Sequence, residues 1–273
     1  MKESLSVRLL YETIPGRMVL KLLVNPKVSK AAGVLLDSRI SKCLIKGFKK
    51  SNNISLKDVI IPQGGFKSFN DFFARKRNIK LEISKGELIS PCDAFLTCIP
   101  IKKNTIYDIK HTRFTLEELL KDKKLAKEFE GGYALVYRLT PAHYHRYCHC
   151  VNGMATKHKT IKGILHCVRP IVTSKIPVFV QNSREYQVYS TDEFGKVIQM
   201  EVGALLVGRI TNNKLTAGQM VAAGTEKGYF EYGGSTIVVL LQNGKILLDD
   251  KIIKANKGEE ISVSYGERIG ICR

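Results

Sequence analysis

The chain reads Gly228-Tyr229-Phe230-Glu231-Tyr232-Gly233-Gly234-Ser235-Thr236-Ile237-Val238-Val239-Leu240 where a glycine-rich turn runs into a β-branched apolar segment. The segment predicts a buried strand, because such side chains pack well on a pleated sheet. Paired glycines permit backbone geometries that bulkier residues resist, and they leave the Gly234 carbonyl unshielded. Ser235 Oγ could therefore attack its own preceding peptide bond. The alternative is an ordinary turn between two strands.

Strands are predicted along most of the chain after Tyr133. The segments with strand composition are Tyr133 to Leu139, Val178 to Gln181, Gln187 to Ser190, Gln199 to Arg209, Thr236 to Gln242 and Lys245 to Leu248. Residues 1–50 predict helices, and the capping-box pattern that begins at Thr115 opens a helix to about Phe129. The predicted fold is α+β, with N-terminal amphipathic helices that precede a mainly antiparallel β core, sandwich or barrel-like.

The composition is that of a basic globular protein. Its 273 residues carry a formal net charge of +19, and the hydrophobic fraction of 44% can fill the core of one large domain. Residues 1–50 alone hold 11 Lys and Arg against three Asp and Glu. This charge favours a polyanionic partner, either nucleic acid or anionic lipid, and does not separate the two.

A basic amphipathic helix is predicted between Lys27 and Phe48. Such a helix either lies on a membrane surface or packs its apolar side on the domain and leaves its lysines in water; we favour the membrane. No apolar run is long enough to predict a spanning helix, and no signal peptide is predicted. We therefore divide the chain into a basic helical membrane-facing segment, 1–50, and a β-rich catalytic domain, 51–273.

A second segment rich in reactive side chains is Pro141-Ala142-His143-Tyr144-His145-Arg146-Tyr147-Cys148-His149-Cys150. A zinc site made by Cys148, His149, Cys150 and His145 is disfavoured, because adjacent strand residues point to opposite sides and no paired Cys-x-x-Cys is present. We predict no metal. The seven cysteines lack the spacing of a disulfide scaffold, which favours a reducing compartment.

Together the two segments resemble the phosphatidylserine decarboxylase family. Its signatures are a Leu-Gly-Ser-Thr or Gly-Gly-Ser-Thr turn, a Pro-x-x-Tyr-His-Arg run and a Ser-Pro-x-Asp-Gly run. The matching segments here are Gly233 to Thr236, Pro141 to Arg146 and Ser90 to Ala94. Further similarity appears in Phe69 to Arg75, Val202 to Ile210 and Tyr265 to Gly270. The resemblance covers most of the chain in the family's order.

The resemblance implies a proenzyme that cuts itself between Gly234 and Ser235. Ser235 Oγ attacks the Gly234 carbonyl, and elimination leaves a covalent pyruvoyl group in place of the serine. The products are chains 1–234 and 235–273, which stay together as a heterodimer. The pyruvoyl cofactor forms a Schiff base with the substrate amine and takes up electrons during decarboxylation. By resemblance the substrate is phosphatidylserine, the product is phosphatidylethanolamine, and the pathway is phospholipid biosynthesis.

The resemblance also implies an Asp-His-Ser arrangement for self-cleavage, in which Asp93 and Ser235 match the first and last members. The histidine is open, because family members often read His-Arg-x-His and this chain has Cys148 at the second histidine. We favour His149, brought into place by a one-residue bulge, ahead of His145 and then Cys148. His145 is the first choice for the acid that protonates the carbanion. Arg146 is a candidate for phosphate or carboxylate contact.

These expectations describe a peripheral enzyme on the cytoplasmic face of the cell membrane. Its partner is phosphatidylserine in an anionic membrane surface, with no nucleic acid. One alternative is a pyruvoyl-dependent decarboxylase of a soluble amino acid, which needs the same ketone but no membrane-facing helix. The other is a non-enzymatic basic β-rich module that binds RNA or lipid, and it predicts an uncut chain.

Overall fold

An eight-stranded antiparallel sheet forms the centre of the protein, in the order β13-β9-β10-β11-β15-β7-β4-β17. The computed structural model describes residues 5–102, 105–107, 113–173, 176–205, 209–233, 235–254 and 259–273. The strands are β4 (Ala94–Pro100), β7 (Tyr133–Leu139), β9 (Gly153–Ile161), β10 (Arg184–Thr191), β11 (Gly195–Val202), β13 (Met220–Val221), β15 (Ser235–Leu241) and β17 (Ile261–Val263). Strand β15 lies between β11 and β7, and every residue of it is buried.

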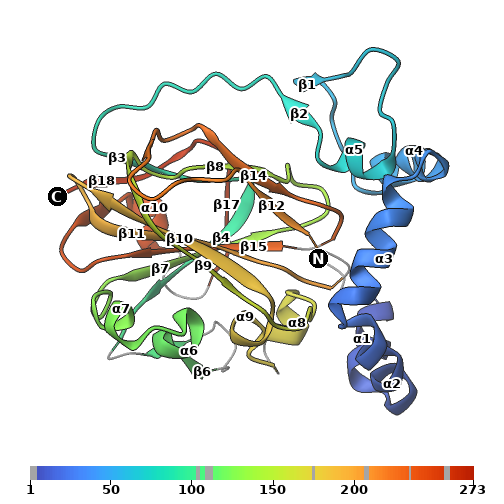
Figure 1. Ribbon diagram of the computed structural model, residues 1–273, viewed down its shortest axis with the longest axis horizontal. Coiled ribbons are helices and arrows are strands. Elements are labelled where there is room, and N and C mark those ends of the chain that lie inside the picture. Colours follow the sequence, from blue (N-terminus) through green and yellow to red (C-terminus); the bar gives the residue numbers. More distant parts are fainter. Residues whose placement is uncertain are drawn as a thin grey trace.

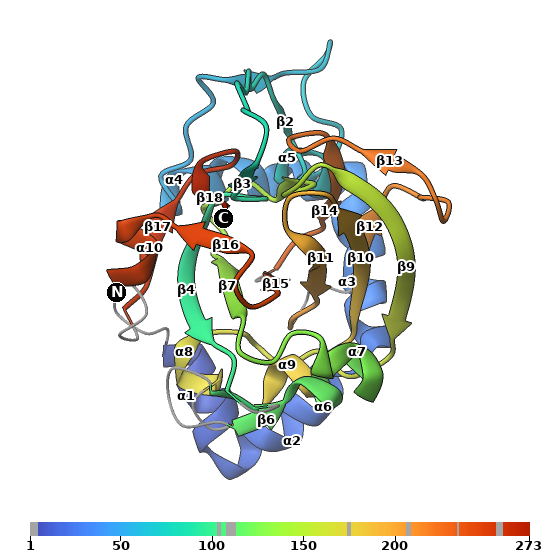
Figure 2. The ribbon, with the colours of Figure 1, turned by 90° about the vertical axis from the view of Figure 1, so that its left-hand side faces the viewer.

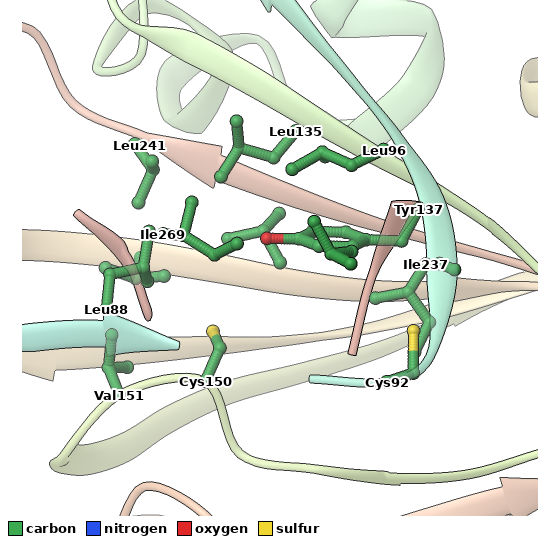
Figure 3. Close-up of a cluster of buried hydrophobic side chains, with 14 of the residues drawn as sticks. Leu88, Cys92, Leu96, Leu135, Tyr137, Cys150, Val151, Ile237, Leu241 and Ile269 are labelled. Atoms are coloured by element: carbon green, nitrogen blue, oxygen red, sulfur yellow. The ribbon is translucent and has the colours of Figure 1, made fainter. Parts of the chain in front are cut away.

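Different layers cover the two faces of this sheet (Figure 1). Short helices pack on one face, against Val238 and Leu240: α6 (Leu116–Leu120), α7 (Lys123–Lys127), α8 (Pro170–Thr173) and α9 (Val178–Gln181). On the other side are β12-β14-β8 and β16-β18-β3. Their bounds are β3 (Glu87–Ile89), β8 (Arg146–Cys148), β12 (Ile210–Asn212), β14 (Glu226–Phe230), β16 (Ile246–Leu248) and β18 (Arg268–Cys272). Ile237 of β15 packs there with Tyr137 and Leu96 (Figure 3).

The N-terminal helices run along one side of the β core (Figure 1). They are α1 (Leu5–Glu12), α2 (Ile14–Leu23), α3 (Pro26–Asp37), η1 (Arg39–Lys42) and α4 (Cys43–Ser51), and α5 (Phe69–Phe73) follows them. Tyr11 joins α1 to the core by accepting the backbone N–H of Cys167 at 2.9 Å. Asn70 of α5 donates its amide to Asp37 at 2.9 Å, which ties α5 to the end of α3. None of the described helices is long and apolar enough to cross a membrane.

The remaining described elements are β1 (Val59–Ile60), β2 (Lys76–Arg77), β5 (Thr105–Tyr107), β6 (Arg113–Thr115) and α10 (Asp250–Lys254). The predicted α+β class with a mainly antiparallel core is confirmed. The central sheet stays open, because its end strands β13 and β17 do not pair with each other in the described part of the chain. Figure 2 shows its strong curvature.

Four details of the prediction are wrong. The strand predicted from Gln199 to Arg209 ends at Val202, the last residue of β11. The predicted strand at Val178–Gln181 is the helical turn α9; it follows Pro177, and Val178 and Phe179 are buried beneath the sheet. Over four residues a buried helical turn and a buried strand share one composition. The helix predicted to reach Phe129 ends at Leu120, because Lys121 is left-handed (φ 50°) and Asp122 caps α7, although the Thr115 capping box is confirmed. The helix predicted over residues 27–48 breaks at Ser38, which has extended backbone angles.

Candidate active site

The candidate site lies at the end of the central sheet where β15 begins. Ser235 pairs with Leu139, the last residue of β7. The next strand, β4, begins at Ala94, directly after Asp93. Neighbouring strands are about 4.8 Å apart, so the backbones of Ser235 and Asp93 are on the order of 10 Å apart at the same sheet end. Gly234, the predicted cleavage residue, lies outside the described residues.

The Ser235 side chain is buried without a partner. Its Oγ atom has no hydrogen bond among the described residues, and the residue is fully inaccessible to solvent. Because side chains alternate along a strand, Ser235 points to the same side as Ile237, toward the layer that contains β8. A buried hydroxyl normally has a partner, so the orphaned Ser235 Oγ needs an explanation, and its position next to the predicted cleavage bond offers one.

His145 is the second buried group without a full set of partners. Its Nδ1 lies 2.9 Å from the backbone carbonyl of His143, an acceptor, so Nδ1 carries the proton. That tautomer leaves a lone pair on Nε2, and this atom is buried with no partner in the described structure. His145 therefore presents a free basic nitrogen inside the protein, one residue before β8 begins.

The surroundings of His145 keep its ring neutral. Burial, with a smaller contribution from the Arg75 charge, lowers the pKa of His145 to about 3, although the backbones of His143 and Gly233 act in the opposite direction. The ring packs on Phe73 of α5 with 4.0 Å between centroids. His145 also accepts the Phe230 N–H through its backbone carbonyl at 3.0 Å, which holds it beside the turn that leads to Ser235.

Asp93 reaches the same end of the sheet but has other partners. Its carboxylate accepts Arg77 Nη1 at 2.9 Å and the Tyr265 backbone N–H at 2.8 Å. Its negative charge also raises the pKa of His143, against a larger lowering by burial. No hydrogen bond joins Asp93 to His145 or Ser235 in the described residues, so an Asp-His-Ser chain of hydrogen bonds is absent from this conformation.

His149 and Cys148 are held elsewhere. His149 Nδ1 bonds to Tyr189 Oη at 2.8 Å. Tyr189 of β10 pairs with Val197 of β11, which in turn pairs with Leu241 of β15. Leu241 is the last residue of β15, so His149 is held at the far end of that strand from Ser235. Burial lowers the pKa of His149 to about 3. Cys148 lies against the Pro91 carbonyl at 3.6 Å, and burial raises its pKa to about 12, so it remains a thiol.

Arg146 is occupied by protein partners. Its Nε donates to the Ala74 carbonyl at 2.7 Å, and Nη1 forms a 2.7 Å ion pair with Glu226. The guanidinium also lies 4.8 Å from the Tyr229 ring centroid. These contacts connect β8 to β14 and to the end of α5, and they favour a structural role for Arg146 over contact with a substrate.

A cavity of about 340 Å³ adjoins the site on the side of the N-terminal helices. It lies between α3 and the segment that precedes Gly233, and its lining includes Ser29, Lys30, Asn70, Glu231 and Tyr232. Ser29 Oγ is buried there without a partner among the described residues. Since Tyr232 is next to Gly233 in the chain, this cavity reaches the glycine turn.

Comparison with known proteins shows which family the chain is similar to. A model of the family described as phosphatidylserine decarboxylase matches residues 69–271. A phosphatidylserine decarboxylase proenzyme of Ruminiclostridium cellulolyticum is 41% identical over 270 residues, covering 96% of this chain and 90% of the relative.

This chain belongs to the phosphatidylserine decarboxylase family. Two more proenzymes of the family are similar to it. Phosphatidylserine decarboxylase proenzyme 2 of Clostridium acetobutylicum is 40% identical, covering 97% of this chain and 91% of the relative; that of Clostridium tetani is 35% identical, covering 95% and 93%. The family match spans α5 to β18 and so contains Asp93, His145 and Ser235.

Two contacts of the candidate site were not predicted from the sequence. Arg75 and Phe73 both surround His145, through charge and ring packing. Their segment, Phe69 to Arg75, carried part of the family resemblance, and that similarity was the available signal. It could not show that the end of α5 packs on a histidine about 70 residues further along the chain, because that contact exists only in the folded protein.

Proposed function

We propose that this protein decarboxylates phosphatidylserine to phosphatidylethanolamine, using a pyruvoyl group that it makes from Ser235 by cutting the Gly234–Ser235 bond. The observation that carries this proposal is that Ser235 Oγ and His145 Nε2 are both buried without a hydrogen-bond partner among the described residues, and that the Gly233 backbone acts on the His145 ring. A nucleophile and a base are the minimum set for self-cleavage. Family membership supports the reaction and the substrate.

Self-cleavage needs a base, and His145 fits that role better than the first-favoured His149. The Ser235 proton passes to His145 Nε2 as Oγ bonds to the Gly234 carbonyl carbon, and His145 gives it to the Ser235 nitrogen as the amide C–N bond breaks. Loss of the Ser235 α-proton then expels the Gly234 carboxylate. Water replaces ammonia at the new N-terminus and leaves a ketone. His149 is bonded to Tyr189, level with the far end of β15 from Ser235, and the Cys148 thiol has no free base form near neutral pH.

Asp93 has a positioning role in this proposal. Its bonds to Arg77 and to the Tyr265 backbone join β2 and the segment before β18 to the start of β4. The negative charge near His143 stabilises positive charge on the loop that carries His145. Asp93 thus favours proton uptake by that loop during cleavage.

The mature site then acts on a substrate amine. The pyruvoyl ketone supplies an electron sink that condenses with the amine and accepts electrons as carbon dioxide leaves. His145 delivers the proton to the resulting carbanion. A bound substrate anion beside the imidazole would raise the pKa of His145 from its low value in the empty site and let it carry that proton. Because this region is buried, water is kept from protonating the carbanion in place of His145.

The two cleaved chains remain one folded unit. Strand β15 begins at the new N-terminus and is hydrogen-bonded to β11 on one side and β7 on the other. The strands β17 and β18 of the same chain pair with β4 and β3 of the larger chain. Separation of the two chains would break an eight-stranded sheet at its centre, so they persist as a heterodimer.

Residues 1–50 serve as the membrane-facing segment ahead of the 51–273 catalytic domain. Ile14, Met18 and Leu22 lie along one side of α2 with 72%, 68% and 68% of their surface exposed. Exposed lysines and arginines lie nearby, among them Arg17 and Lys21. Apolar side chains of a basic helix insert into the interface of an anionic membrane. The enzyme is thus peripheral, and its seven free thiols favour the cytoplasmic face.

The intact mass of the purified, denatured protein tests the proposal first. We expect two chains, 1–234 and 235–273, the smaller one lighter by one ammonia than a peptide that begins with serine. The same preparation should release carbon dioxide from vesicles that contain phosphatidylserine. Release from free amino acids alone would support the soluble-substrate alternative. An active preparation with one uncut mass would rule out the pyruvoyl mechanism.

A triple substitution tests the membrane-facing segment. The changes Ile14→Ser, Met18→Ser and Leu22→Ser should weaken cosedimentation with phosphatidylserine vesicles by about tenfold or more, because the apolar surface that enters the interface is lost. Self-cleavage should stay unchanged. A control with Met220→Ser, Leu247→Ser and Ile253→Ser removes apolar surface that is also exposed but lies outside the N-terminal helices. Equal loss of binding in both variants would contradict the assignment.

A further inference from the structure

Among the described residues, Arg75 is a buried cation without an ion-pair partner. Only 5% of its surface is exposed, and Nε has no hydrogen-bond partner among the described residues. Among the described residues, its guanidinium makes one hydrogen bond, from Nη1 to the Phe73 carbonyl at a long 3.4 Å. The carboxylate whose charge reaches it, that of Asp93, is already bonded to Arg77. Burial accordingly lowers the pKa of Arg75.

Arg184 shows how this protein satisfies a buried guanidinium that has a structural role. Arg184 is 1% exposed, and its nitrogens donate to the backbone carbonyls of Glu118, Leu119, Val180 and Asn182 at 2.8 to 3.0 Å. Burying a charge costs free energy unless such partners are supplied. Arg75 lacks such partners among the described residues, so its guanidinium retains donors for another group.

The position of Arg75 places those donors at the candidate active site. The guanidinium lies 5.4 Å from the ring centroid of Phe72, and its charge acts directly on the imidazole of His145. His145 in turn packs on Phe73, two residues before Arg75. A bound anion would therefore lie between a fixed positive charge and the histidine beside Gly233.

We propose that Arg75 binds the phosphodiester of the substrate. This inference rests on the proposed function, because it needs a phospholipid at the site. A guanidinium matches the geometry of two oxygens on one phosphate. The substrate carboxylate is the less suitable partner: its charge disappears as carbon dioxide leaves, so a guanidinium on it would stabilise the ground state more than the transition state. The phosphodiester keeps its charge throughout the reaction.

The test compares Arg75→Gln and Arg75→Lys with wild type on short-chain phosphatidylserine below its micelle concentration, so that membrane binding does not contribute. Short-chain phosphatidylethanolamine is added as an inhibitor, because it retains the phosphodiester and lacks the carboxylate. We expect Arg75→Gln to be cleaved normally. Its KM for the substrate and the inhibition constant of the product should both rise by about 10- to 100-fold, and Arg75→Lys should recover part of the loss. Arg268→Gln, which removes an exposed charge, is the control.

Each other outcome overturns the inference. A raised KM with an unchanged inhibition constant assigns Arg75 to the carboxylate. If the KM and the inhibition constant are both unchanged, Arg75 has only a structural role. If neither variant is cleaved, Arg75 serves the proenzyme and not the substrate. Failure of the wild type to release carbon dioxide from phosphatidylserine would instead be a failure of the proposed function, and the wild-type measurement separates the two cases.

Discussion

Ser235→Ala is expected to remain a single chain of 273 residues with no decarboxylase activity. The change removes the only atom that can open the Gly234–Ser235 bond in the proposed reaction, and without cleavage no ketone forms. The loss is therefore complete, below the detection limit of a carbon dioxide release assay. Intact mass measures the first effect and turnover of phosphatidylserine vesicles the second.

Thr236 offers a matched control for that experiment. Its Oγ1 is also buried and without a partner in the described structure, but it lies on the opposite face of β15. Thr236→Val should therefore be cleaved and active. Neither change removes a hydrogen bond seen among the described residues, so neither should lower the free energy of unfolding by the roughly 1–3 kcal/mol that a lost buried partner costs. Cleavage of Ser235→Ala would refute Ser235 as the nucleophile.

His145→Gln is expected to block self-cleavage, with a rate at least about a hundredfold below wild type, the usual contribution of a general base. Glutamine keeps much of the side-chain volume and offers no basic nitrogen to Ser235. His149→Gln and Cys148→Ser are the matched changes at the other two candidates. Both should still be cut, because His149 is bound to Tyr189 and Cys148 remains protonated. Time courses of chain cleavage on gels measure all three.

The pH dependence of cleavage gives a second readout on the same base. Burial lowers the pKa of His145 to about 3, so the neutral, proton-accepting form persists from alkaline pH down to nearly that value. The wild-type rate should therefore change little between pH 8 and pH 5, about the range over which an ordinary histidine becomes protonated. A tenfold fall per pH unit below about pH 6.5 would indicate a base with an unperturbed pKa. Normal cleavage of His145→Gln would exclude this residue outright.

Local sequence patterns predicted four of the eight strands of the central sheet, β7, β10, β11 and β15, and missed β9 and the short strands β13 and β17. The strand at Tyr133–Leu139 has the predicted bounds, and β15 differs from its prediction by one residue at each end. Both are long β-branched or aromatic runs, for which composition is a strong signal. Prediction failed for Val178–Gln181, where four residues are too few to separate helix from strand. It also missed β4, because a strand that begins inside a motif gives a weak composition signal.

For the candidate site too, some residues were predicted from the sequence and others needed the structure. Ser235 and Asp93 follow from short motifs, and the fold places both at one end of the central sheet. The choice between His145 and His149 needed contacts instead. A one-residue bulge could be imagined from the sequence for His149, but Tyr189 holds that ring toward the far end of β15. Only the hydrogen bond from Nδ1 to the His143 carbonyl shows which nitrogen of His145 is free.

The sequence by itself determined the class of fold, the glycine–serine bond that is predicted to be cleaved, the basic N-terminal helices and the family resemblance. These features depend on residues that are close together in the chain, where propensity, spacing and charge act directly. Tertiary structure alone decided that α5 brings Phe73 and Arg75 to His145, and that Ser235 Oγ is buried without a partner. Burial, orphaned polar atoms and shifted pKa values arise from segments far apart in sequence, so they exist only once those segments pack.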